Sequence, residues 1–138
     1  MVKTNLVSCC ILKSKNKFLV SQRPSSKIFA DFWEFPGGKV ENNESFQKAI
    51  IRELKEELGI TADKKNLINL DVITHAYKKN EITILTIFFL KKWSGIVNAR
   101  EGQKIEWLNI AQIKKLNFLE GSKIILNKLE SGFYNFYF

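Results

Sequence analysis

The sequence predicts an α/β protein built as a layered sandwich. Segments with strand character alternate along the chain with segments of helical character. Residues 82–90 are apolar at nearly every position, which suits a strand covered on both faces. Residues 46–58 carry apolar side chains at steps of four, which suits a helix with one buried face. Strands interleaved with helices around a doubly covered strand imply a layered α/β sandwich.

The beginning of the chain is expected to form a hairpin followed by a polar loop. Residues 5–12 and 18–22 have strand character, and the polar residues 13–17 between them suit a turn. Residues 23–31 are polar and contain a proline, so they are expected to form a loop. Residues 32–35 are expected to be extended, because proline at the next position disfavours helix.

The clearest helix is expected after a glycine turn. Pro36-Gly37-Gly38 is predicted to be a turn, since glycine permits unusual backbone conformations. The helix then covers residues 46–58. Ser45 or Asn43 is expected to cap its start and Gly59 to end it.

The second half of the chain adds strands and a further helix. Strands are expected at residues 67–74, 81–91 and 105–108, and an amphipathic helix at 122–129. The aromatic tail at residues 133–138 either folds back onto the sheet or packs against a second subunit. The sequence leaves both arrangements of the tail open.

Length and composition fit one domain that spans residues 1–138. The hydrophobic fraction of 45% fits a packed globule rather than a disordered chain. Cys9 and Cys10 are adjacent, so in a strand they point to opposite faces and make a poor disulfide pair. With no signal peptide or membrane-spanning stretch visible, we expect a cytoplasmic protein with no membrane partner.

The chain is basic, with a formal net charge of +8. Such a surface attracts polyphosphates and nucleic acids alike. The lysines lie in scattered pairs and form no single block or helical stripe. We therefore expect a solvated lysine-rich surface and no stable nucleic-acid complex.

The sequence also predicts an acidic face on the helix at 46–58. Glu53, Glu56 and Glu57 stand at positions i, i+3 and i+4, so they share one side of the helix. A concentrated set of carboxylates suits a hard cation such as Mg²⁺, which prefers oxygen ligands. The alternative is an ordinary solvated acidic face, because glutamate is a good helix former. The carboxylates alone leave both interpretations open.

The residues around this face resemble a known family, the Nudix hydrolases. The resemblance spans residues 38–60 and rests on the fixed positions of the Nudix box, which are filled here by Gly38, Glu44, Arg52, Glu53, Leu54, Glu56, Glu57, Gly59 and Ile60. Residues 32–41, 100–103 and 106–107 further resemble the MutT group of that family, whose members are 8-oxo-dGTP diphosphatases. The resemblance implies a Nudix-type α/β/α sandwich with a mixed sheet between helices.

The resemblance also implies a role for each site residue. Glu53, Glu56 and Glu57 would bind Mg²⁺, for which Mn²⁺ can substitute, together with the Gly37 carbonyl. Glu101 matches a loop carboxylate that is a further metal ligand and a possible general base. The catalytic set is completed by two residues that would orient the carboxylates, Glu44 and Arg52. Either Glu53 or Glu101 would take the proton from the attacking water.

The resemblance is incomplete where the base would be recognised. Arg23 and Phe35 match positions that line the nucleotide pocket in MutT-like enzymes. Those enzymes read the oxidised purine with an asparagine before the last helix, where this chain has Ser122, with Asn117 nearby as a substitute. A serine hydroxyl cannot make the paired contacts of an amide. This departure puts 8-oxoguanine selectivity in doubt, but it leaves the hydrolytic chemistry intact.

The expected activity is Mg²⁺-dependent hydrolysis of a nucleoside triphosphate to the monophosphate and pyrophosphate. The substrate implied by the resemblance is 8-oxo-dGTP, which assigns the protein to nucleotide-pool sanitation and mutation avoidance. One alternative is a Nudix hydrolase of ADP-ribose, a dinucleotide polyphosphate or capped RNA. Another is a non-catalytic nucleotide- or RNA-binding module, against which the intact acidic box argues. The assembly is expected to be a monomer or a weak homodimer.

Overall fold

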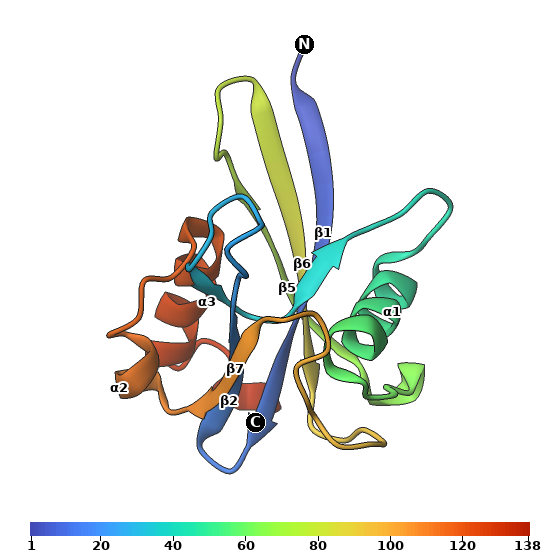
Figure 1. The fold of residues 1–138 in the computed structure, drawn as a ribbon, viewed down its shortest axis with the longest axis vertical. Coiled ribbons are helices and arrows are strands. Elements are labelled where there is room, and N and C mark those ends of the chain that lie inside the picture. The colour runs from blue at the N-terminus through green and yellow to red at the C-terminus, as the bar shows by residue number, and fades with distance from the viewer.

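The computed structural model describes residues 1–138, and its strands and helices alternate as the sequence predicts (Figure 1). The strands are β1 (Lys3–Ser14), β2 (Lys17–Gln22), β3 (Trp33–Glu34), β4 (Gly37–Lys39), β5 (Ile68–His75), β6 (Glu81–Leu90) and β7 (Lys104–Leu108). The α-helices are α1 (Phe46–Leu58), α2 (Ile110–Ile113) and α3 (Glu120–Glu130). Two single 3₁₀ turns are η1 (Lys64–Asn66) and η2 (Asn135–Tyr137).

The sheet is mixed, and β1 and β6 form its centre. These two strands run parallel over their whole length, from the pair Lys3 and Glu81 to the pair Leu12 and Leu90. β5 is antiparallel to β6 on the far side. β1 changes its other partner along its length, from β4 in its middle to β2 at the hairpin, and β2 in turn pairs with β3 and β7.

Helices cover both faces of this sheet. In Figure 1, α1 lies on one side, whereas α2 and α3 lie on the other. Each face has its own core, and the adjacent cysteines separate them: Cys10 packs with Leu54 under α1, and Cys9 packs with Ile125 under α3. This alternation follows from the pleat of β1, whose successive side chains point to opposite faces. The predicted α/β/α sandwich with a mixed sheet is confirmed.

Helix α1 has the predicted boundaries. Ser45 rather than Asn43 is the N-cap, and its hydroxyl accepts a hydrogen bond from the backbone N–H of Lys48 at 3.1 Å. Gly59 ends the helix in the left-handed conformation, with φ of 72°. The buried side chains of the helix are those of Ala49, Ile50, Leu54 and Leu58. Burial of this stripe turns the acidic face away from the sheet core.

The predicted turn at residues 36–38 is wrong, because Gly37 and Gly38 belong to strand β4. β4 pairs with β1 through Gly37 opposite Cys9 and Gly38 opposite Ser8. A Cβ on Gly37 would lie 2.1 Å from the Ser8 carbonyl oxygen. Glycine is therefore required here for close strand approach.

The helical content of the last third of the chain is larger than predicted. Helix α3 begins at Glu120, two residues before the expected start, and the N–H of Gly121 in its first turn donates to the Tyr77 hydroxyl at 2.9 Å. This distant partner satisfies a group that the helix itself leaves free. The short helix α2 was not predicted; Asn109 and Gln112 hold its start in a capping box.

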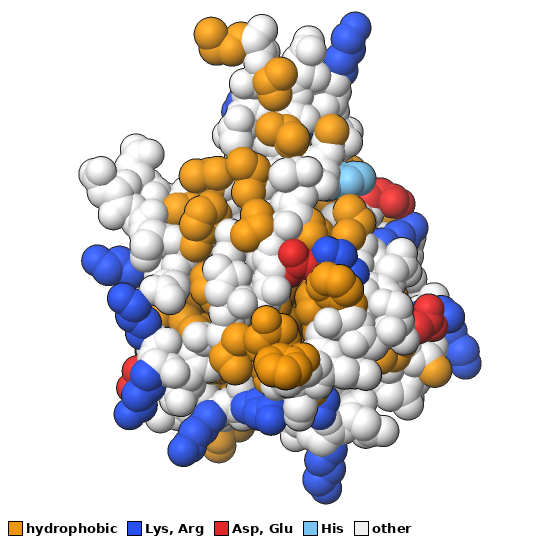
Figure 2. All heavy atoms as spheres, turned by 180° about the vertical axis from the view of Figure 1, so that it is seen from behind, with side chains coloured by type: hydrophobic (Ala, Val, Ile, Leu, Met, Phe, Trp, Pro, Cys, Tyr) orange, Lys and Arg blue, Asp and Glu red, His pale blue; other side chains and the backbone are white.

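The aromatic tail folds back onto the sheet, which is the first of the two predicted arrangements. Tyr134 is buried and donates its hydroxyl hydrogen to Asp71 at 2.8 Å. The Phe138 ring lies 4.7 Å from that of Phe89, between ring centroids. Figure 2 shows apolar side chains running down the middle of one face, with lysine and arginine side chains along its edges. None of the helices has the length and hydropathy needed to cross a bilayer.

Candidate active site

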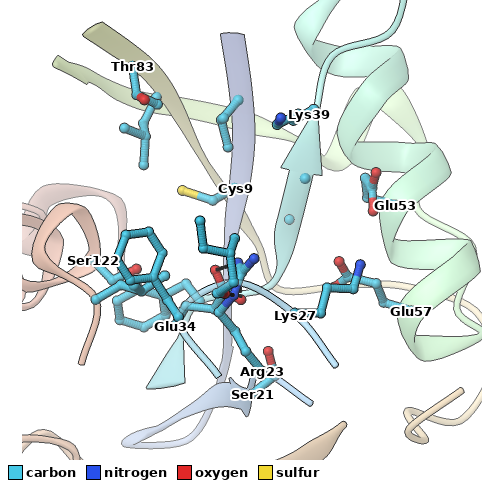
Figure 3. Close-up of a pocket in the computed structure, with 18 of the residues that line it drawn as sticks. Cys9, Ser21, Arg23, Lys27, Glu34, Lys39, Glu53, Glu57, Thr83 and Ser122 are labelled. Carbon is cyan, nitrogen blue, oxygen red and sulfur yellow. Dashed lines mark hydrogen bonds and ion pairs between the residues drawn. The ribbon is translucent and has the colours of Figure 1, made fainter. Parts of the chain in front are cut away.

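A cleft of about 700 Å³ lies between the acidic face of α1 and the start of α3. Figure 3 shows Glu53 and Glu57 projecting from α1 on one side, Ser122 on the other, and Arg23 and Glu34 between them. Most predicted site residues line this cleft: Arg23, Phe35, Gly37, Arg52, Glu53, Glu56, Glu57, Glu101 and Ser122. The structure thus brings together residues from five separate segments of the chain.

Glu53 lies directly against the glycine strand. Its side chain is only 15% exposed, and a Cβ on Gly38 would lie 2.3 Å from its Cδ and 2.4 Å from Oε1. Glu56, one turn further along α1, has a side chain that is 50% exposed. The acidic face therefore runs from a carboxylate packed on β4 to one that reaches solvent.

Arg52 connects the carboxylates to one another. Its guanidinium forms a bidentate pair with Glu44, at 2.8 and 2.9 Å, and donates to Glu53 at 2.8 Å and to Glu56 at 3.2 Å. It also donates to the Lys39 carbonyl at 3.0 Å, which ties it to β4. The hydrogen bonds from Arg52 lower the pKa of Glu44 to about 2. Glu44 does not line the cleft; its link to the site is the ion pair with Arg52.

Burial and the neighbouring acidic side chains disfavour ionisation of Glu57. Burial, followed by the nearby charge of Glu53, raises the pKa of Glu57 to about 9. Burial also raises the pKa of Glu34, although its ion pair with Arg23 opposes that shift. Acidic groups crowded in this way favour the approach of a cation.

The donor atoms of the cleft fit a hard divalent cation in their chemistry. Carboxylates of Glu53, Glu56, Glu57 and Glu101 and the backbone at Gly37 border the same space, and oxygen donors of this kind suit Mg²⁺. In this conformation no three acidic, histidine or cysteine side chains form a compact ligand group. Arg52 draws Glu53 and Glu56 to its guanidinium instead.

Glu101 reaches the cleft because its loop is docked on the end of α1. The N–H of Arg100 donates to the Glu57 carbonyl at 3.0 Å, and that of Asn98 donates to the Leu58 carbonyl at 3.1 Å. Gly59 permits this docking, since a Cβ there would lie 2.9 Å from the Arg100 Cδ. These contacts fix the loop that follows β6 to the C-terminal end of α1.

The far end of the cleft differs in part from the sequence prediction. Ser122 lines it, whereas Asn117 does not: the Asn117 carbonyl accepts a hydrogen bond from the Trp33 N–H at 2.8 Å, which fixes the segment beside β3. The substitute role considered for Asn117 is therefore not supported by its position. Phe35 borders the cleft but is only 2% exposed, and its ring packs against that of Phe118 at 5.4 Å.

Sequence reasoning missed two polar residues at this end. Glu34 forms an ion pair with Arg23 at 3.1 Å, and Arg23 also donates to the Ile28 carbonyl at 2.8 Å. Tyr77 lines the same region and contacts the Phe29 ring, with centroids 5.7 Å apart. A charged residue within an aromatic extended segment was a usable signal for Glu34. No comparable pattern marked Tyr77, whose position depends on how β5 and β6 pair.

A family model described as the NUDIX domain matches residues 3–129 of this chain. The chain belongs to the NUDIX family. The sequence-based identification as a MutT-like Nudix pyrophosphohydrolase is confirmed by this match and by the relatives that share it. The glutamate-bearing helix α1, strand β4 and the Glu101 loop all lie inside the matched region.

Curated Nudix relatives extend over most of the chain. An 8-oxo-dGTP diphosphatase of Buchnera aphidicola subsp. Schizaphis graminum is 33% identical over 130 residues, which cover 94% of this chain and 95% of the relative. A CTP pyrophosphohydrolase of Escherichia coli is 36% identical over 102 residues, with 73% of each chain covered.

Solved structures share the fold. The E. coli ORF135 protein superposes with a TM-score of 0.81 at 28% identity and covers 95% of this chain and 91% of its own. A MutT structure from work on Aliivibrio salmonicida and Vibrio cholerae gives a TM-score of 0.77 at 28% identity, with coverage of 91% and 96%. The overall sandwich is therefore shared with solved structures, one of which is a MutT protein.

Proposed function

We propose that this chain is a Mg²⁺-dependent nucleoside triphosphate pyrophosphohydrolase whose substrate is 8-oxo-dGTP. The observation that carries the proposal is the acidic face of α1, which borders a cleft large enough for a nucleotide together with Glu101. The 8-oxo-dGTP diphosphatase of the Buchnera relative matches nearly the full length of both chains, which supports the choice of substrate.

Within this proposal, the metal-binding residues and Arg52 have distinct roles. Glu53, Glu56, Glu57, Glu101 and the Gly37 carbonyl would hold Mg²⁺, for which Mn²⁺ can substitute. The bound cation would supply positive charge against the phosphates and acidify the attacking water. Arg52, held by Glu44, orients Glu53 and Glu56.

Hydrolysis then requires a base and an in-line attack. Glu53 or Glu101 accepts a proton from the water as its oxygen bonds to the β-phosphorus. The bond from that phosphorus to the oxygen bridging to the α-phosphorus breaks, which yields the nucleoside monophosphate and pyrophosphate. Glu53 is the more enclosed of the two bases, because Gly38 and Arg52 restrain its carboxylate.

A second candidate substrate is CTP. The relative that is 36% identical is a CTP pyrophosphohydrolase, and Ser122 stands where an amide would read an oxidised purine. The half-buried pair of Arg23 and Glu34 lies at the same end of the cleft and offers charged partners to either base. The chemistry at the phosphates is the same for both substrates.

A pyrophosphate-release assay with Mg²⁺ tests the proposal. The panel contains 8-oxo-dGTP, dGTP, CTP, dCTP and ADP-ribose, and the Glu53→Gln variant is the control for chemistry at this site. We expect kcat/KM to be highest for 8-oxo-dGTP and to be lost in the variant. Equal efficiency on dGTP and 8-oxo-dGTP would remove the sanitising role, and a preference for CTP would favour the second candidate. Absence of turnover on every substrate would refute the enzymatic assignment of this cleft.

The proposed activity places the protein in the cytoplasm, where it would remove oxidised nucleotides before DNA replication. The proposed roles in nucleotide-pool sanitation and mutation avoidance depend on 8-oxo-dGTP being the substrate. The proposed assembly is a monomer or a weak homodimer.

A further inference from the structure

The side-chain amide of Gln103 forms a bridge between two backbone groups of the site. Its Nε2 donates to the Glu57 carbonyl oxygen at 2.9 Å, and its Oε1 accepts from the Glu101 N–H at 2.8 Å. Glu57 lies at the end of α1, whereas Glu101 lies 44 positions later in the loop before β7. One side chain thus joins the backbones of two carboxylate-bearing residues.

The local backbone is shaped for this bridge. Gly102 adopts the left-handed conformation, with φ of 75°, and this lets the Gln103 side chain fold back onto the Glu101 N–H. Gln103 is half-buried and lines the cleft, so its hydrogen bond to the Glu57 carbonyl is partly shielded from competing water, whereas the bond from the Glu101 N–H is exposed. Shielding of this kind strengthens a hydrogen bond relative to an exposed one.

Glu101 is held by fewer contacts than Glu53. Glu53 is held by Arg52 and packed on Gly38. Glu101 is exposed, and its one hydrogen bond runs from its backbone N–H to Gln103. The neighbouring contact from Arg100 to the Glu57 carbonyl docks the loop, but it leaves the following residue free to turn.

We infer that Gln103 is a positioning residue that fixes the separation between Glu57 and Glu101. This inference rests on the proposed function, because it assigns both carboxylates to the same metal site. Only an amide of this length serves both partners, since one end donates and the other accepts. Loss of the bridge leaves Glu101 on an exposed loop and weakens the site, although none of the proposed metal ligands is replaced.

Two variants separate bridging from general polarity. Gln103→Met keeps the length of the side chain and removes both hydrogen bonds. Gln103→Asn keeps the amide but shortens the side chain by one methylene, so it cannot span both partners. The matched control is Gln112→Met, because Gln112 also uses its amide to hold a backbone N–H, in the capping box of α2 outside the cleft.

The first readout is Mn²⁺ binding to the substrate-free protein, measured by the loss of the free-ion electron paramagnetic resonance signal. We expect both Gln103 variants to bind Mn²⁺ about 10- to 100-fold more weakly, as is typical when a residue that orients metal ligands is removed. Amide hydrogen exchange at Glu101 should accelerate in both variants. The Gln112→Met protein should match wild type in both measurements. Its melting temperature should fall by about as much as that of Gln103→Met.

The second readout is pyrophosphate release as a function of Mg²⁺ concentration. We expect the Mg²⁺ midpoint to rise in both Gln103 variants and to stay at the wild-type value in Gln112→Met. Mn²⁺ affinity and Mg²⁺ midpoint within twofold of wild type in Gln103→Met, or wild-type behaviour of Gln103→Asn, would overturn the inference. Wild-type protein that binds Mn²⁺ but hydrolyses no nucleotide would refute the proposed function and leave the binding test of Gln103 valid.

Discussion

Replacement of Gly38 by alanine should disable the site while leaving the fold in place. Gly38 has an ordinary backbone conformation, so alanine introduces no φ strain there. The added Cβ would lie 2.4 Å from Oε1 of Glu53, whereas ordinary contact begins near 3.4 Å. The obstructing group is the free end of a flexible side chain, which can move aside. Glu53 must therefore withdraw by about 1 Å.

A displacement of that size is large for a group that acts on a water or a metal. A misplacement of about 1 Å costs on the order of 10²-fold in rate. We expect kcat for pyrophosphate release to fall by about that factor, and the free energy of unfolding to change by less than about 1 kcal/mol. The assay combines steady-state kinetics on the best substrate with thermal unfolding of the same preparation.

The neighbouring glycine provides the contrast. A Cβ on Gly37 would lie 2.1 Å from the Ser8 carbonyl oxygen and 2.7 Å from the Cys9 Cα, and these backbone atoms cannot withdraw without opening the pairing of β1 with β4. Gly37→Ala should therefore lower stability by about 1–3 kcal/mol. The reasoning is refuted if Gly38→Ala retains kcat within threefold of wild type, or if it loses as much stability as Gly37→Ala.

Three further predictions follow from the site and the tail. Glu53→Gln should lower kcat by about 10³-fold with an unchanged melting temperature, since it keeps the shape and removes a base; near wild-type turnover would contradict the role of this carboxylate. Folding raises the pKa of Glu57 from 4.5 to about 9. Between these two pH values the folded protein keeps a proton that the unfolded chain has released, so the free energy of unfolding of the metal-free protein should fall as the pH rises from 4.5 to about 9. Urea unfolding across pH should show this slope in wild type and a smaller slope in Glu57→Gln. Tyr134→Phe removes the hydrogen bond to Asp71 and should lower stability by about 1 kcal/mol, measured by urea unfolding, with no change in kcat.

Local patterns in the sequence were sufficient for most elements of the fold. β5, β6 and β7 begin and end within one residue of their predicted limits, and α1 matches at both ends. These segments succeed because their apolar periodicity agrees with their burial in the sheet and under α1. Local consistency of this kind is what makes a segment predictable.

The errors occur where a distant contact determines the local structure. Pro36-Gly37-Gly38 has the composition of a turn, but pairing with β1 makes its glycines a strand. Helix α3 begins early because the Tyr77 hydroxyl accepts the hydrogen bond from Gly121. Neither partner lies within the local segment, so no local pattern could indicate it.

For the site, the sequence by itself determined which groups are proposed to carry the chemistry. The spacing of Glu53, Glu56 and Glu57 places them on one side of α1. The Nudix box adds Glu44 and Arg52, and the resemblance to the MutT group adds Glu101. Spacing is sufficient here because a helix converts sequence separation directly into direction.

Only the tertiary structure decided how those groups are held and what faces them. Arg52 binds Glu44, Glu53 and Glu56 at once, and Gln103 bridges Glu57 to Glu101 across 44 positions of sequence. Such contacts depend on the mutual packing of α1, β4 and the loop before β7. Packing fixes distances between segments that are far apart in the chain, and local sequence patterns contain no information about those distances.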